Sequence, residues 1–165
     1  MGHDARALGR LFAEASLGAP EKAVGFVLWR VVHRYQREVD RVLDPLDLTH
    51  LQFTTLTMAA WLAQSGEPVP QAQLGEFSDI HPMQLSLMLK ALEGKGLIVR
   101  TQNNQDARAK NVEVTDAGVE ALRHALPRVI EVQERMFGAD GSPGGSLLEA
   151  LVRLEGPAPL RGESG

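Results

Sequence analysis

The chain has 165 residues, of which 44% are hydrophobic and 23% charged, with a formal net charge of −4 and no cysteine. The length suffices for one domain with a real core, and the lack of cysteine excludes a disulfide framework, a thiolate metal site and thiol-based redox sensing. No run approaches the roughly 18 apolar residues of a membrane span and the N-terminus shows no signal-peptide pattern, so we expect a cytoplasmic protein with no membrane partner.

Two helical patterns occupy the first 45 residues. Residues 4–17 form a short amphipathic pattern that Gly18 to Pro20 interrupts. From residue 21 to 43, apolar side chains recur on one face of a long predicted helix, which ends at Asp44-Pro45. A second stripe on this helix consists of Arg30, Arg34, Arg37 and Arg41. We interpret the stripe as a solvated or ion-paired face, with contact to a second protomer or to an anionic ligand as the alternatives.

The next predicted helix has a sharper start. Thr49 and Gln52 have the spacing of a capping box, in which each side chain satisfies the free backbone N–H of the other residue. The pattern predicts a helix from there to about Gln64, followed by a loop over residues 65–68. The side chains expected to be buried are Phe53, Leu56, Ala60 and Trp61.

Two further helices are predicted close together. The first runs over residues 70–79, with Leu74 and Phe77 inward, and the second over residues 81–95, with Pro82 in its first turn. The core face of the second helix consists of Leu85, Met88, Leu89 and Leu92. Its other face consists of Met83, Gln84, Ser86, Leu87 and Lys90. This arrangement indicates a helix-turn-helix, whose second helix can lie in the major groove of DNA.

A β-hairpin is predicted next. Residues 97–100 and 111–114 have strand patterns and are joined by a polar loop, after which Thr115 caps another helix. Helix, turn, helix and hairpin together indicate a winged helix-turn-helix. The charged residues of the wing region are Lys95, Arg100, Arg108 and Lys110 against Asp106 alone. An acidic chain needs such a locally basic face to bind nucleic acid, and we expect Arg108 and Lys110 to meet DNA phosphates or the minor groove.

Four short motifs follow one another in residues 85–118, whose sequence is LSLMLKALEGKGLIVRTQNNQDARAKNVEVTDAG. They are Leu92-Glu93, Gly96-Leu97, Asp106-Ala107-Arg108, and Thr115 with Gly118 three residues later. In this order the motifs resemble the MarR family of bacterial transcriptional regulators. The resemblance extends over about residues 21–155 and leaves residues 1–20 outside the pattern.

The resemblance implies roles for the wing and the second helix. It implies that Arg108 enters the minor groove and that Asp106 holds the turn or pairs with Arg108. On the second helix, the resemblance implies base and phosphate contacts at Met83, Gln84, Ser86, Leu87 and Lys90. Gln84 suits adenine, Ser86 a base edge or a phosphate, and Lys90 a phosphate or guanine. Met83 and Leu87 are less polar than the family pattern, so they either touch thymine methyl groups or simply pack.

The ends of the chain are predicted to form a helical dimerisation region. Residues 119–137 indicate a long helix, and residues 147–154 a short one that is apolar on too many sides for a free surface, which favours a homodimer. The resemblance also implies a ligand cavity between the dimerisation helices and the DNA-binding domain. Its candidate lining residues are Trp29, His33, Met58 and Trp61, each of which is more commonly a core residue. A small apolar or aromatic effector, with any acidic group neutralised by Arg30 or Arg34, would suit such a cavity.

We therefore expect a mainly α fold, with a winged helix-turn-helix domain, a two-stranded β-wing and a helical dimerisation region. The predicted parts are an extra helix and linker (1–20), the dimerisation region (21–45 and 116–155), the DNA-binding domain (46–115) and a flexible tail (156–165). The expected function is ligand-responsive repression by a homodimer on a pseudo-palindromic double-stranded DNA operator. The alternative is a winged-helix interaction or dimerisation module without sequence-specific DNA binding. No catalytic, metal-ligand or cofactor pattern emerges, so an enzyme is not expected.

Overall fold

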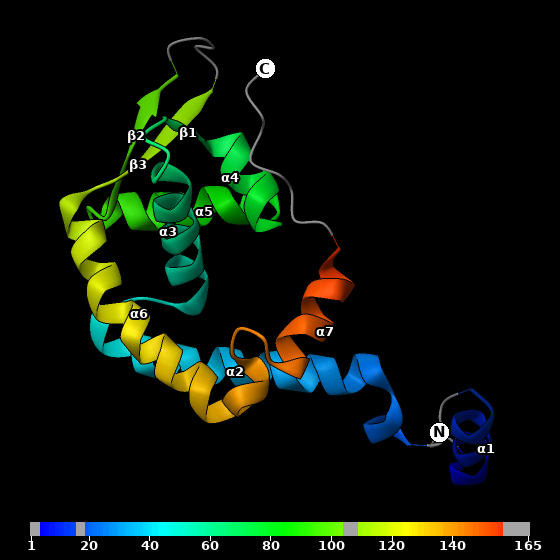
Figure 1. Ribbon diagram of the computed structural model, residues 1–165. Coiled ribbons are helices and arrows are strands. Elements are labelled where there is room, and N and C mark those ends of the chain that lie inside the picture. Colours follow the sequence, from blue (N-terminus) through cyan, green and yellow to red (C-terminus); the bar gives the residue numbers. More distant parts are fainter. Residues whose placement is uncertain (1–3, 16–18, 104–108, 157–165) are drawn as a thin grey trace. The chain divides into compact units, whose positions relative to one another are not determined.

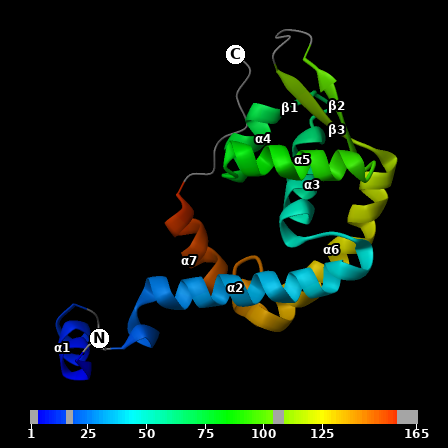
Figure 2. The same ribbon diagram turned by 180° about the vertical axis from the view of Figure 1, so that it is seen from behind.

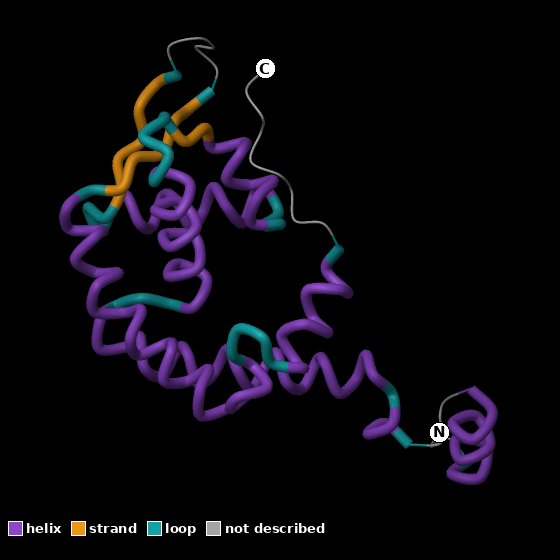
Figure 3. The backbone as a smooth tube through the Cα atoms, in the orientation of Figure 1, coloured by secondary structure: helices purple, strands orange, loops and turns teal. Residues whose placement is uncertain are grey.

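The computed structural model describes residues 4–15, 19–103 and 109–156. The chain divides into two compact units, Met1–Glu38 and Val39–Gly165. Helices make up most of both units, and the described strands all lie in the second (Figure 3). Within these described ranges, none of the helices combines the length and the apolar character that crossing a membrane requires.

The described residues of the first unit form two helices and a turn. Helix α1 spans Ala5–Ala15, a 3-10 turn spans Pro20–Lys22, and α2 spans Val24–Leu43, so that its last residues belong to the second unit. Both helices agree with the sequence patterns. Between residues 24 and 38 no side chain of α2 is buried, and Val24, Leu28, Trp29 and other large apolar side chains are exposed.

The predicted capping box is present at the start of α3, which spans His50–Ala63. The hydroxyl of Thr49 accepts a hydrogen bond from the backbone N–H of Gln52 at 3.2 Å. In return, the backbone N–H of Thr49 donates to Oε1 of Gln52 at 3.3 Å. Before the cap, a 3-10 turn at Asp44–Leu46 ends α2, and Asp47 adopts a left-handed conformation with φ 53°.

The apolar face of α3 differs from the prediction near its end. Leu56, Ala59 and Leu62 are buried, whereas Ala60 is half-buried and Trp61 is 50% exposed. The prediction that Trp61 is buried is therefore wrong. At 100° per residue, Trp61 lies about 140° around the helix from Leu56, outside the stripe that faces the core.

The helix-turn-helix consists of α4, Gln71–Ser78, and α5, Pro82–Gly94. Asp79, with φ 51°, turns the chain between them. Both helices pack against α3 in the second unit, which contacts each of them (Figures 1 and 2). Their core residues are Leu74, Leu85, Leu89 and Leu92, whereas Phe77 and Met88 are only half-buried.

The wing belongs to a three-stranded antiparallel sheet rather than to an isolated hairpin. Strands β2, Ile98–Gln102, and β3, Lys110–Val114, form the predicted hairpin, and β1, Val69–Pro70, adds to the other side of β3 in the order β1-β3-β2. Val69 lies opposite Val112, and both are buried. The sequence did not predict β1, because a two-residue strand that ends in proline has no alternation and lacks one donor for pairing.

The C-terminal part of the second unit is helical. Thr115 caps α6, Asp116–Phe137, by accepting a hydrogen bond from the N–H of Gly118 at 3.1 Å. Arg128 of α6 donates from Nη1 to the carbonyl of Val42 at 3.3 Å, which ties α6 to the last turn of α2. A 3-10 turn at Gly138–Gly141 leads to α7, Ser146–Glu155, in which no residue is buried.

Candidate DNA-binding surface

All the residues predicted for the outward face of α5 are exposed in the structure. The side chain of His81 caps its start by accepting the backbone N–H of Met83 at 3.3 Å, and Pro82 takes the first position, where no N–H is needed. The outward residues, all exposed, are Met83, Gln84, Ser86, Leu87 and Lys90. Met83 is 71% and Leu87 58% exposed, so neither packs into the core of this unit. The sequence left two roles open for these side chains, contact with thymine methyl groups and simple packing. Their exposure favours the first.

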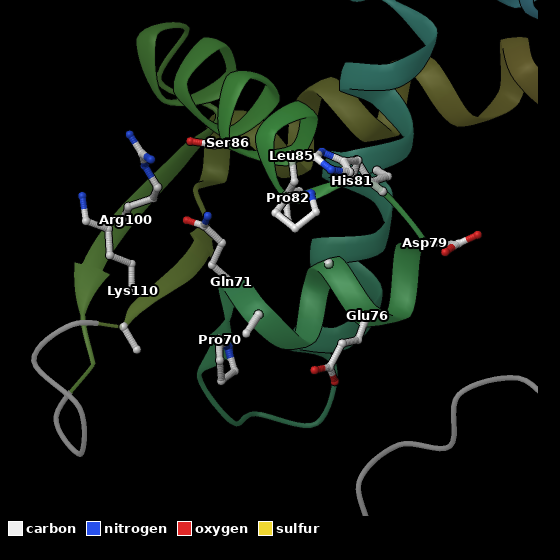
Figure 4. A pocket seen from close by; sticks show the side chains of 14 residues that line it. Pro70, Gln71, Glu76, Asp79, His81, Pro82, Leu85, Ser86, Arg100 and Lys110 are labelled. Atoms are coloured by element: carbon white, nitrogen blue, oxygen red, sulfur yellow. The ribbon is translucent and has the colours of Figure 1, made fainter.

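A cleft of about 940 Å³ runs beside α5. It is bounded by the start of α4, the α4–α5 turn, the first half of α5 and the cleft-facing side of the wing. Figure 4 shows Ser86 on α5 directed toward the strands that carry Arg100 and Lys110, with Gln71 at the start of α4 between them and the turn. Helix α5 is the recognition helix of the helix-turn-helix. The cleft therefore brings the Ser86 hydroxyl of this helix and two cations of the wing, Arg100 and Lys110, to one surface.

The wing strands are joined by side chains as well as by the backbone ladder. Thr101 of β2 donates to the Glu113 carboxylate of β3 at 2.8 Å, and Asn103 donates to the Asn111 amide oxygen at 3.0 Å nearer the loop. Arg108 and Asp106, to which the resemblance gives the minor-groove contact and its support, lie outside the described residues. Their roles stay predictions.

Arg100 is held by Glu93, the next-to-last residue of α5. Its Nε and Nη2 donate to the same carboxylate oxygen, Oε2, at 3.1 and 2.5 Å. The Arg100 side chain is 16% exposed and that of Glu93 38% exposed. These hydrogen bonds hold the pKa of the Glu93 carboxyl below its usual value, so the pair stays ionised at neutral pH.

Lys95 is also engaged within the protein. Its Nζ lies 3.1 Å from the Asp47 carboxylate, donates to the Asp47 carbonyl, and donates to Oε1 of Gln52 at 3.2 Å. The end of α5 is thereby attached to the cap of α3. Two of the four cations counted in the wing region thus have intramolecular carboxylate partners, and the surface is less basic than the sequence count indicated. Three of these four cations, Lys95, Arg100 and Lys110, lie in the described residues, and of these three Lys110 is exposed.

The candidate ligand residues fall in both units. In the first unit, the rings of Trp29 and His33 are 4.1 Å apart between centroids, and Nδ1 of His33 donates to the Trp29 carbonyl at 2.8 Å. They line a shallow hollow of about 350 Å³ on α2 together with Arg30, Arg34, Arg37, Val27 and Val31. In the second unit, Met58 is half-buried and Trp61 exposed on α3.

Sequence reasoning assigned no role to Glu93 beyond its place in a family motif. Its spacing of seven residues from Arg100 crosses a turn at Gly96, so no helix or strand periodicity relates the two side chains. In the described ranges, no group of three or more His, Asp or Glu side chains is arranged to hold a metal ion.

Comparison with known proteins agrees with this geometry. The profile of the MarR family matches residues 48–110, which span α3 to the first residue of β3. The HTH-type transcriptional regulator YdcH of Bacillus subtilis is 36% identical over 125 residues, covering 76% of this chain and 85% of YdcH. An HTH-type transcriptional regulator of Bacillus anthracis is 29% identical over 121 residues, covering 71% of this chain and 78% of that protein.

Solved structures share the fold. CouR from Rhodococcus jostii RHA1, bound to p-coumaroyl-CoA, superimposes with a TM-score of 0.71 at 25% identity, over 87% of this chain and 99% of CouR. A mutant of MarR from E. coli, in complex with operator DNA, gives a TM-score of 0.67 at 21% identity, over 81% and 94% of the two chains. The two Bacillus relatives are described as transcriptional regulators and not as enzymes, as expected. The chain belongs to the MarR family and is a DNA-binding, winged helix-turn-helix transcriptional regulator.

Proposed function

We propose that the protein is a homodimeric, ligand-responsive repressor that reads a pseudo-palindromic operator with its two α5 helices. The observation that carries this proposal is the outward face of α5, whose five residues are all exposed beside a cleft that Lys110 also lines. A helix of this kind enters the major groove, and two copies related by a two-fold axis engage half-sites about one helical turn apart. The E. coli MarR complex with operator DNA supports the proposal through its shared fold.

The residues on this face differ in what they can read. Gln84 suits adenine, Ser86 a base edge or a phosphate, and Lys90 a phosphate or guanine. Leu87 carries no hydrogen-bonding group and Met83 only a weakly accepting thioether, and the exposure of both fits contact with the methyl groups of thymine. On the wing, Lys110 contacts a phosphate, while Arg108 reaches the minor groove with Asp106 supporting the turn; the latter two roles rest on the sequence.

Leu87→Ala tests the reading of thymine. Truncation is expected to weaken binding by about 1 kcal/mol to an operator selected by the protein from random DNA, because roughly this much free energy attaches to one or two buried methyl groups. Replacing the contacted thymine with uracil removes the same methyl contact from the DNA side. The two changes together should therefore cost no more than either alone. Fluorescence anisotropy with both operators measures all four affinities.

Leu11→Ala is the matched control for this cycle. Leu11 is 56% exposed on α1, close to the value for Leu87, but it lies outside the part of the chain that resembles the family. The control should bind both operators like the unchanged protein. Additive losses for Leu87→Ala and uracil would show that Leu87 does not contact that methyl group.

The proposed dimer follows from apolar surface that the described chain leaves open. On α7, Leu147, Leu151, Val152 and Leu154 are all exposed, and on α6 so are Leu126 and Ile130. Exposed large apolar side chains that gather on helices mark interaction surfaces in soluble proteins. A second copy of the chain is the partner that a two-fold operator requires.

The proposed effector is a small, largely apolar or aromatic molecule with an acidic group. The adjoining rings of Trp29 and His33 offer stacking surface, and Arg30 and Arg34 lie beside them in the hollow on α2. CouR was solved with p-coumaroyl-CoA, an aromatic thioester of a phosphate-bearing carrier, and this supports an aromatic anion here too. Such a ligand would act by favouring a dimer in which the α5 helices no longer match the half-site spacing.

Titrating the protein–operator complex tests the effector proposal. Aromatic carboxylates, phenols and p-coumaroyl-CoA are the probes, with free coenzyme A and mild peroxide as controls. We expect at least one aromatic anion to weaken operator binding by about 5- to 150-fold, the usual range of coupling between two sites. Arg34→Ala should shift that titration to higher ligand concentration. Since the chain has no cysteine, release by peroxide but by none of the small molecules would contradict the proposal.

A further inference from the structure

The ion pair between Glu93 and Arg100 joins the two parts of the DNA-binding surface. Glu93 stands in the last turn of α5, and Arg100 is the middle residue of β2, the first strand of the wing. Both bonds go to one carboxylate oxygen, at 3.1 and 2.5 Å. Between the two residues the chain turns at Gly96, whose φ is +71°. The pair thus connects the recognition helix to the wing across a tight turn.

The pair contributes little charge to DNA binding. Attraction to DNA depends on cations that neutralise phosphates and release their counterions. The Arg100 side chain is 16% exposed and its charge is already neutralised by Glu93, so the pair as a whole carries no net charge. Its effect on DNA binding must therefore come through geometry.

The geometry concerns Lys110. In the sheet, Arg100 lies opposite Val112, and Lys110 is two residues from Val112 on the same strand. Because side chains two residues apart point to the same face of a strand, Arg100 and Lys110 share the cleft face of the wing. Both line the cleft opposite Ser86 of α5 (Figure 4). Fixing Arg100 to α5 consequently fixes how far Lys110 stands from the recognition helix.

We infer that Glu93 and Arg100 are positioning residues, whose ion pair sets the distance between the wing and the recognition helix so that Lys110 meets a phosphate while α5 lies in the major groove. The inference rests on the proposed function, because it requires that α5 and the wing bind one DNA molecule together. In this inference, Glu93 and Arg100 do not themselves contact DNA. They set the spacing between two parts of the protein that do, α5 and Lys110.

Glu93→Gln separates this role from simple electrostatics. Removing a negative charge beside a DNA-binding surface should tighten binding if charge alone mattered. Loss of positioning should instead lower the affinity, so we expect binding to the selected operator to weaken about fivefold. The slope of log Kd against log salt should also fall by about one, because the Lys110 phosphate contact is lost.

A double-mutant cycle with Lys110→Gln completes the test. In the unchanged protein, Lys110→Gln should weaken binding about fivefold, and in the Glu93→Gln background it should cost less than about twofold, because the contact is already gone. Glu120→Gln is the control: it also removes one carboxylate, and it breaks an exposed pair with Arg123 on α6. Its affinity should be unchanged or slightly higher.

Each remaining outcome is decisive. Equal or tighter binding by Glu93→Gln, or fully additive losses in the cycle, would overturn the positioning role while leaving the proposed function intact. If Lys110→Gln binds the operator as tightly as the unchanged protein, the wing contact of the proposed function fails, and the inference fails with it.

Discussion

Leu147→Asp together with Leu151→Asp is expected to yield a folded monomer that no longer binds its operator. Both leucines are exposed in the chain and lie one turn apart on α7, so their replacement leaves the core of the second unit intact. In the proposed dimer each would be buried, and burial of a leucine contributes about 1.5–3 kcal/mol. A two-fold axis doubles the effect, and four new carboxylates add a desolvation cost.

The dissociation constant of the dimer should therefore rise more than about 100-fold. Operator affinity should fall as well, because both half-sites must be engaged. Light scattering gives the mass, and circular dichroism confirms that the helices remain. Arg153→Asp is the control, since it adds a carboxylate to α7 on the side away from the two leucines. A double variant that remains a tight dimer would show that the interface lies elsewhere.

Gly118→Ala is expected to be the most destabilising single substitution that we predict. Gly118 lies in the first turn of α6, and a Cβ there would collide with the carbonyl oxygen of Leu97 and stand 2.8 Å from Cγ1 of Val114. That carbonyl cannot move away, because it accepts the backbone N–H of Thr115 at 3.1 Å. Overpacking against fixed backbone should lower the free energy of unfolding by about 3 kcal/mol.

Urea denaturation measures this loss, and Gly94→Ala provides the matched control. Gly94 ends α5, and a Cβ there would meet nothing within 4 Å. The same substitution should therefore leave stability unchanged or raise it by about 0.5–1 kcal/mol. Equal effects of the two substitutions would contradict the close approach of α6 to the wing.

The sequence predicted the elements whose determinants are local. The capping box at Thr49 and the cap at Thr115 depend on residues three positions apart, and both are present. The outward face of α5 follows from helical periodicity alone, and all five of its predicted residues are exposed. Apolar residues lie on all sides of α3, so periodicity could not select its buried face, and for this reason Trp61 was wrongly expected to be buried.

Features that depend on contacts distant in sequence were not predicted. Strand β1 exists because β3, about 40 residues later, offers it an edge. The count of charges in the sequence included Lys95 and Arg100 in a basic wing. In the structure both form ion pairs within the protein, Lys95 with Asp47 and Arg100 with Glu93. Lys95 reaches a residue 48 positions earlier, and no local pattern encodes that contact.

Footprinting on the DNA upstream of the protein's own gene tests the central claim most directly. The account predicts two protected half-sites centred about one helical turn apart, bound at least 1,000-fold more tightly than random DNA of the same length at about 0.15 M salt. Equal affinity for both DNAs, or a single protected half-site at saturation, would contradict a dimeric operator-reading repressor. That result would favour the alternative of a winged helix used for interaction with proteins.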